Sequence, residues 1–170
     1  MSDSPQKVAV IGAGTMGNGI AHVFAQSGHN VTLVDVNSAA LERAKSTIER
    51  NLERLVAKER ITAQDKEGAL ARLKTSTEMR GAVSDADLVV EAATERLDLK
   101  LQIFEQLDAA APSHAILATN TSSISITKIA AVTQRPDQVI GMHFMNPVPI
   151  MKLVEVIRGY DTSDATTEKV

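Results

Sequence analysis

The stretch KVAVIGAGTMGNGIA, residues Lys7–Ala21, decides the fold. Its first five residues are a short apolar run rich in β-branched side chains, which is typical of a buried strand. Glycines follow in the spacing G-x-G-x-x-G, and a helical pattern begins directly after them. A glycine turn between a strand and a helix leaves helix N–H groups free to bind phosphate. The residues expected at this turn are Gly12, Gly14, Thr15, Met16 and Gly17.

A carboxylate lies near the end of the next apolar run, Val31–Val36. Asp35 follows Gly12 by 23 residues. A carboxylate at this place accepts hydrogen bonds from a ribose 2′-OH and repels a 2′-phosphate, which favours NAD over NADP. The alternative is an ordinary glycine-rich turn followed by an unrelated surface aspartate. The strand, the glycines, the helix and the acid all stand in the expected order, so we favour a dinucleotide site.

Strand and helix patterns alternate along the first two-thirds of the chain, which predicts an α/β fold. Strands are expected at Lys7–Ile11, Val31–Val36, Leu88–Val90, Ala115–Thr119, Val139–His143 and Leu153–Ile157. Helices are expected at Thr15–Ser27, from the N-cap Ser38, from Thr62, and at Leu97–Ala110, Ser125–Ala131 and Thr162–Val170. We therefore expect a Rossmann-type, doubly wound and mostly parallel sheet, with antiparallel pairing at its C-terminal end.

Composition excludes several other classes of protein. The 170 residues include three Phe, one Tyr, no Trp and no Cys, so we expect an aliphatic core and no disulfide or thiolate metal site. The net charge of −3 indicates no nucleic-acid partner. No apolar run approaches the roughly 20 residues that span a bilayer. Residues Met1–Pro5 lack the pattern of a signal peptide, and we expect a cytoplasmic protein without a metal ion.

A histidine and a glutamate stand symmetrically about a proline-rich turn. His143 ends one predicted strand, and Glu155 lies within the next, otherwise apolar, strand. A turn centred on Pro149 would set the two opposite each other, and a carboxylate that orients an imidazole is a common general-base assembly. The alternative is a glutamate that points to water beside a histidine that is merely buried. Spacing alone does not decide between them.

Hydroxyl side chains follow another apolar strand, at Asn120–Ser123. They should lie at the carboxyl edge of the sheet, where α/β proteins bind their ligands. Runs of Ser and Thr at such places also serve simply as helix caps. No G-x-S-x-G segment is present, so acyl-enzyme chemistry is not expected.

Four segments together resemble the L-3-hydroxyacyl-CoA dehydrogenase family, and within it most closely the bacterial 3-hydroxybutyryl-CoA dehydrogenases. They are GAGTMGNGIA (12–21), DLVVEAATE (87–95), NTSSISIT (120–127) and HFMNPVPIMKLVEVI (143–157). The resemblance implies an NAD-binding domain over residues 1–170 that stops before its end. It also implies that the helical C-terminal domain, through which full-length members form homodimers, is absent.

The resemblance assigns roles by motif. His143 would be the general base, Glu155 its electrostatic partner, and Ser122 a ligand of the substrate oxygen close to the nicotinamide. Further contacts to the NAD cofactor would come from Glu95, Lys100 and Asn146. The positions of Asn51 and Lys58 match contacts to CoA in the family.

Charges on the second predicted helix agree with an acyl-CoA partner. Arg50, Arg54 and Lys58 repeat every four residues and form one basic ridge, with Asn51 beside it. Like charges at this spacing are mildly destabilising, so an anionic partner such as the CoA phosphates explains them better than helix stability does. An ordinary solvated helix face is the alternative.

The implied activity is NAD-dependent oxidation of a short-chain L-3-hydroxyacyl-CoA, such as 3-hydroxybutyryl-CoA, to the 3-ketoacyl-CoA. Without the helical domain we expect NAD binding with little turnover. Two alternatives remain open: a non-catalytic NAD-binding module, and a related sugar-acid or crystallin-like dehydrogenase.

Overall fold

A single twisted sheet of seven strands, in the order β3-β2-β1-β4-β5-β6-β7, forms the centre of the computed structural model, which describes residues 6–170. Six strands are parallel, and β7 pairs antiparallel with β6. The strands are β1 (Lys7–Ile11), β2 (Asn30–Val34), β3 (Leu73–Ser76), β4 (Leu88–Glu91), β5 (Ile116–Thr119), β6 (Val139–Phe144) and β7 (Val154–Arg158). The Rossmann-type expectation is confirmed. Residues Met1–Pro5, where no signal peptide was expected, lie outside the described part.

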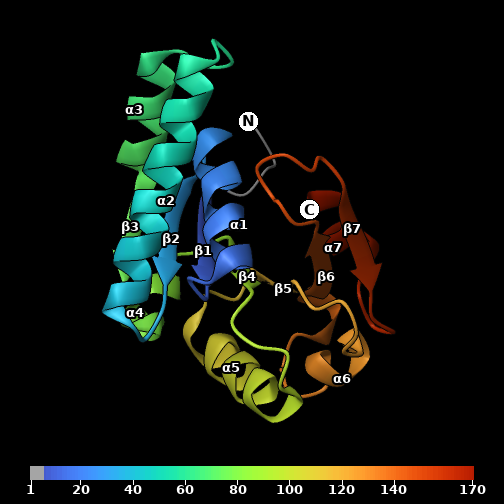
Figure 1. Cartoon of the computed structure of the whole chain (residues 1–170). Coiled ribbons are helices and arrows are strands. Elements are labelled where there is room, and N and C mark those ends of the chain that lie inside the picture. Colours follow the sequence, from blue (N-terminus) through green and yellow to red (C-terminus); the bar gives the residue numbers. More distant parts are fainter. Residues whose placement is uncertain (1–5) are drawn as a thin grey trace.

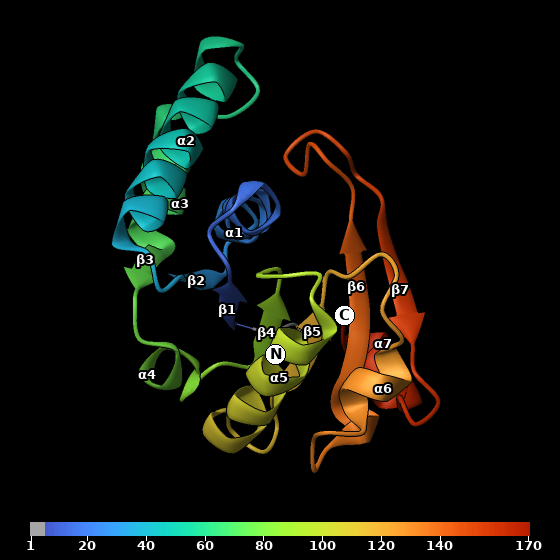
Figure 2. The ribbon, with the colours of Figure 1, turned by 60° about the horizontal axis from the view of Figure 1, so that its bottom comes forward.

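The chain winds outward from the middle of the sheet in both directions (Figures 1 and 2). It runs from β1 through β2 to the edge strand β3, then returns beside β1 as β4 and continues through β5 and β6. The order therefore reverses between β1 and β4, and ligands of such sheets bind at the carboxyl ends of the strands at that point.

Helices cover both faces of the sheet. One face packs against α1 (Thr15–Gln26), α2 (Ser38–Ala57) and α3 (Ala63–Arg72), and the other against α4 (Met79–Val83), α5 (Leu97–Ala110) and α6 (Ile126–Ala130). A short 3₁₀ turn (Pro136–Gln138) precedes β6, and α7 (Asp164–Lys169) follows β7. No helix among residues 6–170 combines the length and the apolar character that a membrane span requires.

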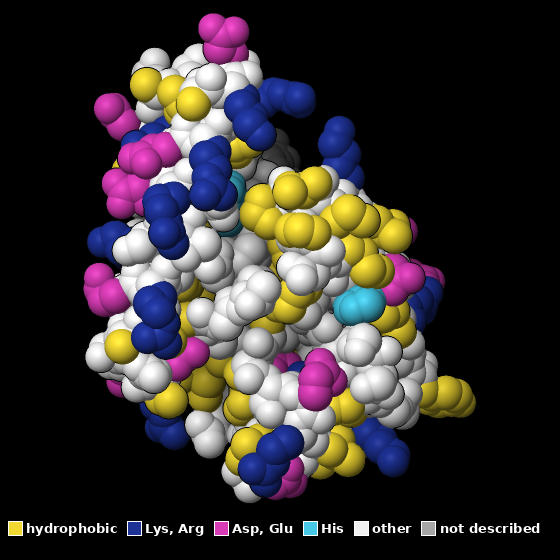
Figure 3. All heavy atoms as spheres, in the orientation of Figure 1, with side chains coloured by type: hydrophobic (Ala, Val, Ile, Leu, Met, Phe, Trp, Pro, Cys, Tyr) yellow, Lys and Arg dark blue, Asp and Glu magenta, His cyan; other side chains and the backbone are white. Residues whose placement is uncertain are grey.

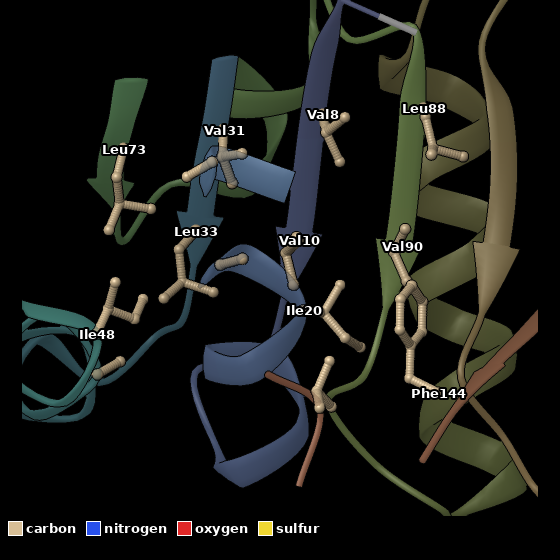
Figure 4. Close-up of a cluster of buried hydrophobic side chains, with 14 of the residues drawn as sticks. Val8, Val10, Ile20, Val31, Leu33, Ile48, Leu73, Leu88, Val90 and Phe144 are labelled. Carbon is tan, nitrogen blue, oxygen red and sulfur yellow. The ribbon is translucent and has the colours of Figure 1, made fainter. Parts of the chain in front are cut away.

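The core is aliphatic, as the composition predicts. Side chains alternate along β1, so that Val8 and Val10 enter the cluster under α1 and α2 while Ala9 and Ile11 enter the cluster under α5. Figure 4 shows the first cluster, in which neighbouring strands contribute valines and leucines to one layer. Among the described residues, Phe104 and Phe144 are the aromatic side chains that are buried.

A strand and an α-helix were missed by the sequence patterns, as was the 3₁₀ turn Pro136–Gln138, and one helix cap was assigned wrongly. The strand β3 is short and at the sheet edge, so that only Leu73 of its four residues is buried and no apolar run marks it. The helix α4 has five residues, too few for a periodic pattern. The N-cap of α2 is Asn37 and not Ser38, because the Asn37 side chain accepts from the N–H groups of the next turn.

Candidate functional site

The three glycines of the turn differ in the space around them. Gly12 has φ +102°, and a Cβ there would lie 2.7 Å from the Ala92 carbonyl oxygen. A Cβ on Gly17 would lie 1.7 Å from the Gly12 oxygen, so that α1 packs directly on the turn. A Cβ on Gly14, in contrast, would have no heavy atom within 4 Å beyond its chain neighbours and its own helix. Two glycines are thus required by packing, and the third leaves open space.

That open space lies at the N-terminus of α1. Gly14 is the N-cap, no side chain caps the helix, and no acidic residue occupies the first turn. The free N–H groups and the positive end of the helix dipole therefore face the open side of the turn. A pyrophosphate fits this place, because it needs backbone donors and room that a Cβ would fill.

Asp35 follows β2 directly and closes the turn from the side. Its carboxylate accepts hydrogen bonds from the N–H of Ala13 at 2.8 Å and from the N–H of Asn37 at 2.9 Å. A carboxylate offers about four acceptor positions, so a ribose hydroxyl can still bind. The sequence predicted the place of Asp35 correctly, although β2 ends two residues earlier than expected, at Val34.

Two cavities meet at Asp35. The first is a cleft of about 700 Å³ between the glycine turn, α2 and the proline-rich turn, and it includes Asn51 and Asn146. The second is a cavity of about 680 Å³ between α4 and α5, with largely apolar walls. The sequence analysis missed the second cavity. Its signal was the pair Leu99 and Ile103, apolar residues one turn apart on α5.

The predicted pairing of His143 and Glu155 is confirmed. The two residues stand opposite each other in the β6–β7 register, and His143 Nδ1 lies 2.8 Å from Glu155 Oε2. The side chains are 22% and 51% exposed. The Nδ1–H donates to the carboxylate, so Nε2 keeps its lone pair and can accept a proton from a ligand. Of the two alternatives from the sequence, the paired arrangement is the one that the structure contains.

The loop that carries Ser122 is tied to β6 beside His143. The side-chain oxygen of Asn120 accepts from the N–H of Phe144 at 2.9 Å, and Thr121 donates to the Glu95 carboxylate at 2.8 Å. Glu95 and Ser122 are therefore brought to the same loop region. Ser122 is exposed and lines a small surface cavity with Ile157, not the cleft beside the glycine turn.

Lys100 is buried beneath this edge of the sheet. Its ammonium forms an ion pair with Glu91, whose carboxylate also accepts from Thr119 at 2.9 Å and from the N–H of Ala93 at 2.8 Å. Both charged side chains are almost fully buried. A contact of Lys100 with the cofactor stays a prediction. The sequence analysis missed Glu91, although a charge at the end of the apolar run LVV was a signal.

Basic side chains follow the exposed face of α2 (Figure 3). Of the three residues predicted to bind CoA, Asn51 lines the cleft, and Arg54 and Lys58 are exposed further along the same face. Arg43 lines the cleft as well and was missed, although it lies eight residues before Asn51 on one helix face.

The other histidines make local contacts. His22 is buried, and burial lowers its pKa. His114 Nε2 lies 3.0 Å from Asp87, and the ring of His29 meets Phe24 edge-on. Within residues 6–170 no three His, Asp or Glu side chains stand close enough together to hold a metal ion.

Comparison with known proteins decides the family. Residues 7–170 match the family described as "3-hydroxyacyl-CoA dehydrogenase, NAD binding domain". The chain belongs to this family. Its cofactor is accordingly NAD, which agrees with the glycine turn and Asp35.

Two curated relatives are dehydrogenases of CoA esters. The chain is 51% identical over 163 residues to a 3-hydroxybutyryl-CoA dehydrogenase of Bradyrhizobium diazoefficiens, covering 96% of this chain and 55% of that protein. It is 48% identical over 165 residues to a 3-hydroxyadipyl-CoA dehydrogenase of Escherichia coli K12, covering 97% of this chain and 34% of the relative.

The fold agrees with solved structures of the same kind. The crystal structure of (S)-3-hydroxybutyryl-CoA dehydrogenase from Ralstonia eutropha superposes with a TM-score of 0.92 at 53% identity, covering 96% of this chain and 57% of that one. The chain thus spans about half the length of two of these relatives and about a third of the Escherichia coli one.

Proposed function

We propose that this domain, within a protein of the length of its relatives, takes part in the NAD-dependent oxidation of the 3-hydroxyl of a short-chain L-3-hydroxyacyl-CoA. The observation that carries the proposal is the hydrogen bond of 2.8 Å between His143 and Glu155, at the sheet edge that also carries the glycine turn. A base and a dinucleotide site at one edge are what the removal of a proton and a hydride requires.

His143 acts as the general base. Its Nε2 accepts the proton of the 3-hydroxyl, and the O–H bond breaks as the carbonyl forms. Glu155 holds the ring by accepting from Nδ1 and stabilises the positive imidazolium that results. In the reverse direction the same Nε2–H donates the proton to the carbonyl oxygen. NAD, when bound, would accept the hydride that leaves carbon 3 of the substrate.

Ser122 positions the substrate oxygen, because the Asn120 anchor to Phe144 holds its loop against β6. Asn146 lines the cleft beside the glycine turn and contacts the cofactor. Glu95 and Lys100, which lie at the same edge of the sheet, contribute further contacts to the cofactor. Asn51, Arg54 and Lys58 form the anionic-ligand face of α2, along which the CoA phosphates bind.

The substrate is a short acyl-CoA such as 3-hydroxybutyryl-CoA, as the names of two relatives suggest. Alone, the 170 residues bind NAD with little turnover, because the related enzymes use chains about twice as long. A competing function is the reduction of a dicarbonyl compound without CoA, because the structure of a diketoreductase superposes on this chain with a TM-score of 0.89 at 33% identity.

The test compares two substrates with the full-length protein. NADH consumption at 340 nm is followed with acetoacetyl-CoA and with acetoacetate, which carries the same carbonyl without CoA. We expect turnover of the CoA ester at least 100-fold more efficient, and inhibition by free CoA. Equal turnover of both compounds, or no effect of CoA, would contradict the CoA assignment. Absence of NADH consumption with either would contradict the proposed reaction.

A matched pair of variants locates the CoA contact. Lys58→Ala removes a cation of the proposed phosphate face. Lys45→Ala removes a cation on another side of the same helix, because 13 positions along the chain separate the two residues by about 140° around the helix axis. We expect the first to raise KM for the CoA ester several-fold and the second to leave it unchanged. Equal KM values for the two variants would remove Lys58 from the site.

A further inference from the structure

Arg43 is a cation in the cofactor cleft without a partner in the described part of the protein. Among the described residues that line the cleft it is the only Lys or Arg, and its guanidinium makes no hydrogen bond or ion pair with residues 6–170. Asp35 is the only carboxylate among the same lining residues. One negative and one positive side chain thus face a single cleft and do not pair with each other.

The two side chains have different surroundings near the start of α2. Asn37 caps the helix, and Asp35 lies just before the cap, where it accepts the N–H groups of Ala13 and Asn37. Arg43 lies five residues into α2, roughly 7.5 Å along the axis, on the face that Ala40, Ala44 and Thr47 also turn to the cleft. Asp35 is held by the backbone, while Arg43 remains available to a ligand.

The two charges have opposite preferences for the adenosine ribose of a dinucleotide. A carboxylate after the second strand binds the 2′-hydroxyl of NAD, whereas a nearby arginine accommodates the 2′-phosphate of NADP. A guanidinium binds phosphate oxygens in a bidentate, charge-assisted way. This chain therefore holds both determinants among the residues that line one cleft.

We propose that Arg43 is a ready-made partner for a ribose 2′-phosphate, and that the charge of Asp35 alone keeps the selectivity for NAD. The inference rests on the proposed function, since it requires the dinucleotide to lie across the glycine turn. Arg43 would then take part in coenzyme selection, in addition to the glycines of the turn and Asp35. Removal of the Asp35 charge should then admit NADP without any added cation.

A double-mutant cycle tests the coupling by binding alone. NADH and NADPH are titrated against wild type, Asp35→Asn, Arg43→Ala and the double variant, with the coenzyme's own emission as the signal, which no Trp of the chain disturbs. We expect wild type to prefer NADH. Asp35→Asn should raise NADPH affinity at least tenfold, and the added Arg43→Ala should cancel most of that gain. Arg43→Ala alone should change NADH affinity less than twofold.

Two further variants serve as controls. Asp35→Ser repeats the cycle with a side chain that still accepts a backbone N–H, so that a folding defect of one replacement does not decide the outcome. Lys45→Ala, on α2 but outside the cleft, controls for the loss of a positive charge, and in the Asp35→Asn background it should leave the NADPH gain intact.

Three results would overturn the role of Arg43. One is NADPH binding to the double variant as tight as to Asp35→Asn. Another is a tenfold loss of NADH affinity in Arg43→Ala, which would place the guanidinium on the pyrophosphate. The third is a loss of CoA binding without any effect on NADPH. If wild type binds NADH but the effects of the two substitutions are not coupled, only this inference is contradicted. If wild type binds no NADH, the proposed function is contradicted as well.

Discussion

The glycine turn and the His143–Glu155 pair lie at the same edge of the sheet, but the chain surrounds them very differently. At the turn, backbone packs against backbone so closely that a Cβ on Gly17 would lie 1.7 Å from an oxygen. At the pair, Glu155 is 51% exposed, and the turn beside it presents apolar side chains to solvent, among them Ile150 at 74%.

Because of this difference in packing, substitutions at the glycine turn should affect folding, whereas substitutions at the His143–Glu155 pair should mainly affect catalysis. A change at the glycine turn alters both the folding free energy and cofactor binding, because buried backbone has no room to adjust. A change at the exposed pair removes an interaction that contributes little to folding. Substitutions at the two places should therefore affect folding and turnover differently. The following predictions run from the largest expected effect, on stability or on turnover, to the smallest.

The largest effect is expected for Gly17→Ala. Its Cβ would overlap the Gly12 oxygen, so α1 must move off the turn, and we expect a loss of more than about 3 kcal/mol in unfolding free energy. Gly14→Ala is the matched control, because its Cβ meets open space. That variant should fold normally and bind NADH more weakly. Urea denaturation and NADH titration measure both, and equal stability of the two variants would contradict the packing argument.

The second effect concerns the buried ion pair between Lys100 and Glu91. Lys100→Met leaves the Glu91 carboxylate buried without its counter-charge, which should cost about 3–5 kcal/mol. Adding Glu91→Gln to Lys100→Met should restore part of this loss. Unfolding in urea measures each variant. A Lys100→Met protein that unfolds at the wild-type midpoint would show that the pair is not needed for folding.

Glu155→Gln should affect turnover far more than stability. The amide keeps the size of the side chain but removes the charge that stabilises the imidazolium, so kcat should fall roughly tenfold or more. The unfolding free energy should change by less than about 1 kcal/mol, because the pair is partly exposed. Steady-state kinetics of the full-length protein and thermal unfolding check the two parts. Unchanged kcat would remove Glu155 from the mechanism.

The smallest effect lies at the opposite edge of the sheet. The carboxylate of Asp87 accepts from the N–H groups of Gln6 and Lys7 and contacts His114. Partial burial raises its pKa, but the hydrogen bonds from Lys7, His114 and Gln6 outweigh this and lower it below the ordinary 3.8. Because the folded pKa is depressed, the ionised carboxylate stabilises the fold above the ordinary pKa.

That contribution should disappear as the pH falls through the folded pKa. Asp87→Asn should therefore be less stable than wild type by about 1 kcal/mol at neutral pH, and the difference should shrink toward pH 3. Urea unfolding of both proteins between pH 7 and pH 3 measures this. A difference that stays constant over the range would show that the charge of Asp87 does not matter.

The turn and the pair could be predicted from sequence because each depends on local order. The strand, glycines and helix of the turn are contiguous, and Asp35 ends the next strand. The register that sets His143 opposite Glu155 followed from symmetry about Pro149, since an antiparallel register is set by the position of its turn. The spacing left open whether the two side chains form a pair.

What was missed depends on contacts between distant segments. Arg43 enters the cleft because α2 packs beside α1, and the second cavity exists because α4 and α5 leave space between them. Glu91 and Lys100 are nine residues apart, and only the return of β4 into the sheet centre buries both. A sequence pattern does not show which of these segments come close together in the folded protein.

We propose that His143 removes the substrate proton, while the glycine turn holds the cofactor independently. Replacement of His143 by Ala in the full-length protein tests it most directly, with NADH-dependent reduction of acetoacetyl-CoA and NADH binding measured on the same sample. We expect kcat to fall roughly 100- to 10,000-fold and NADH affinity to stay within twofold of wild type. Wild-type turnover in this variant would contradict the claim.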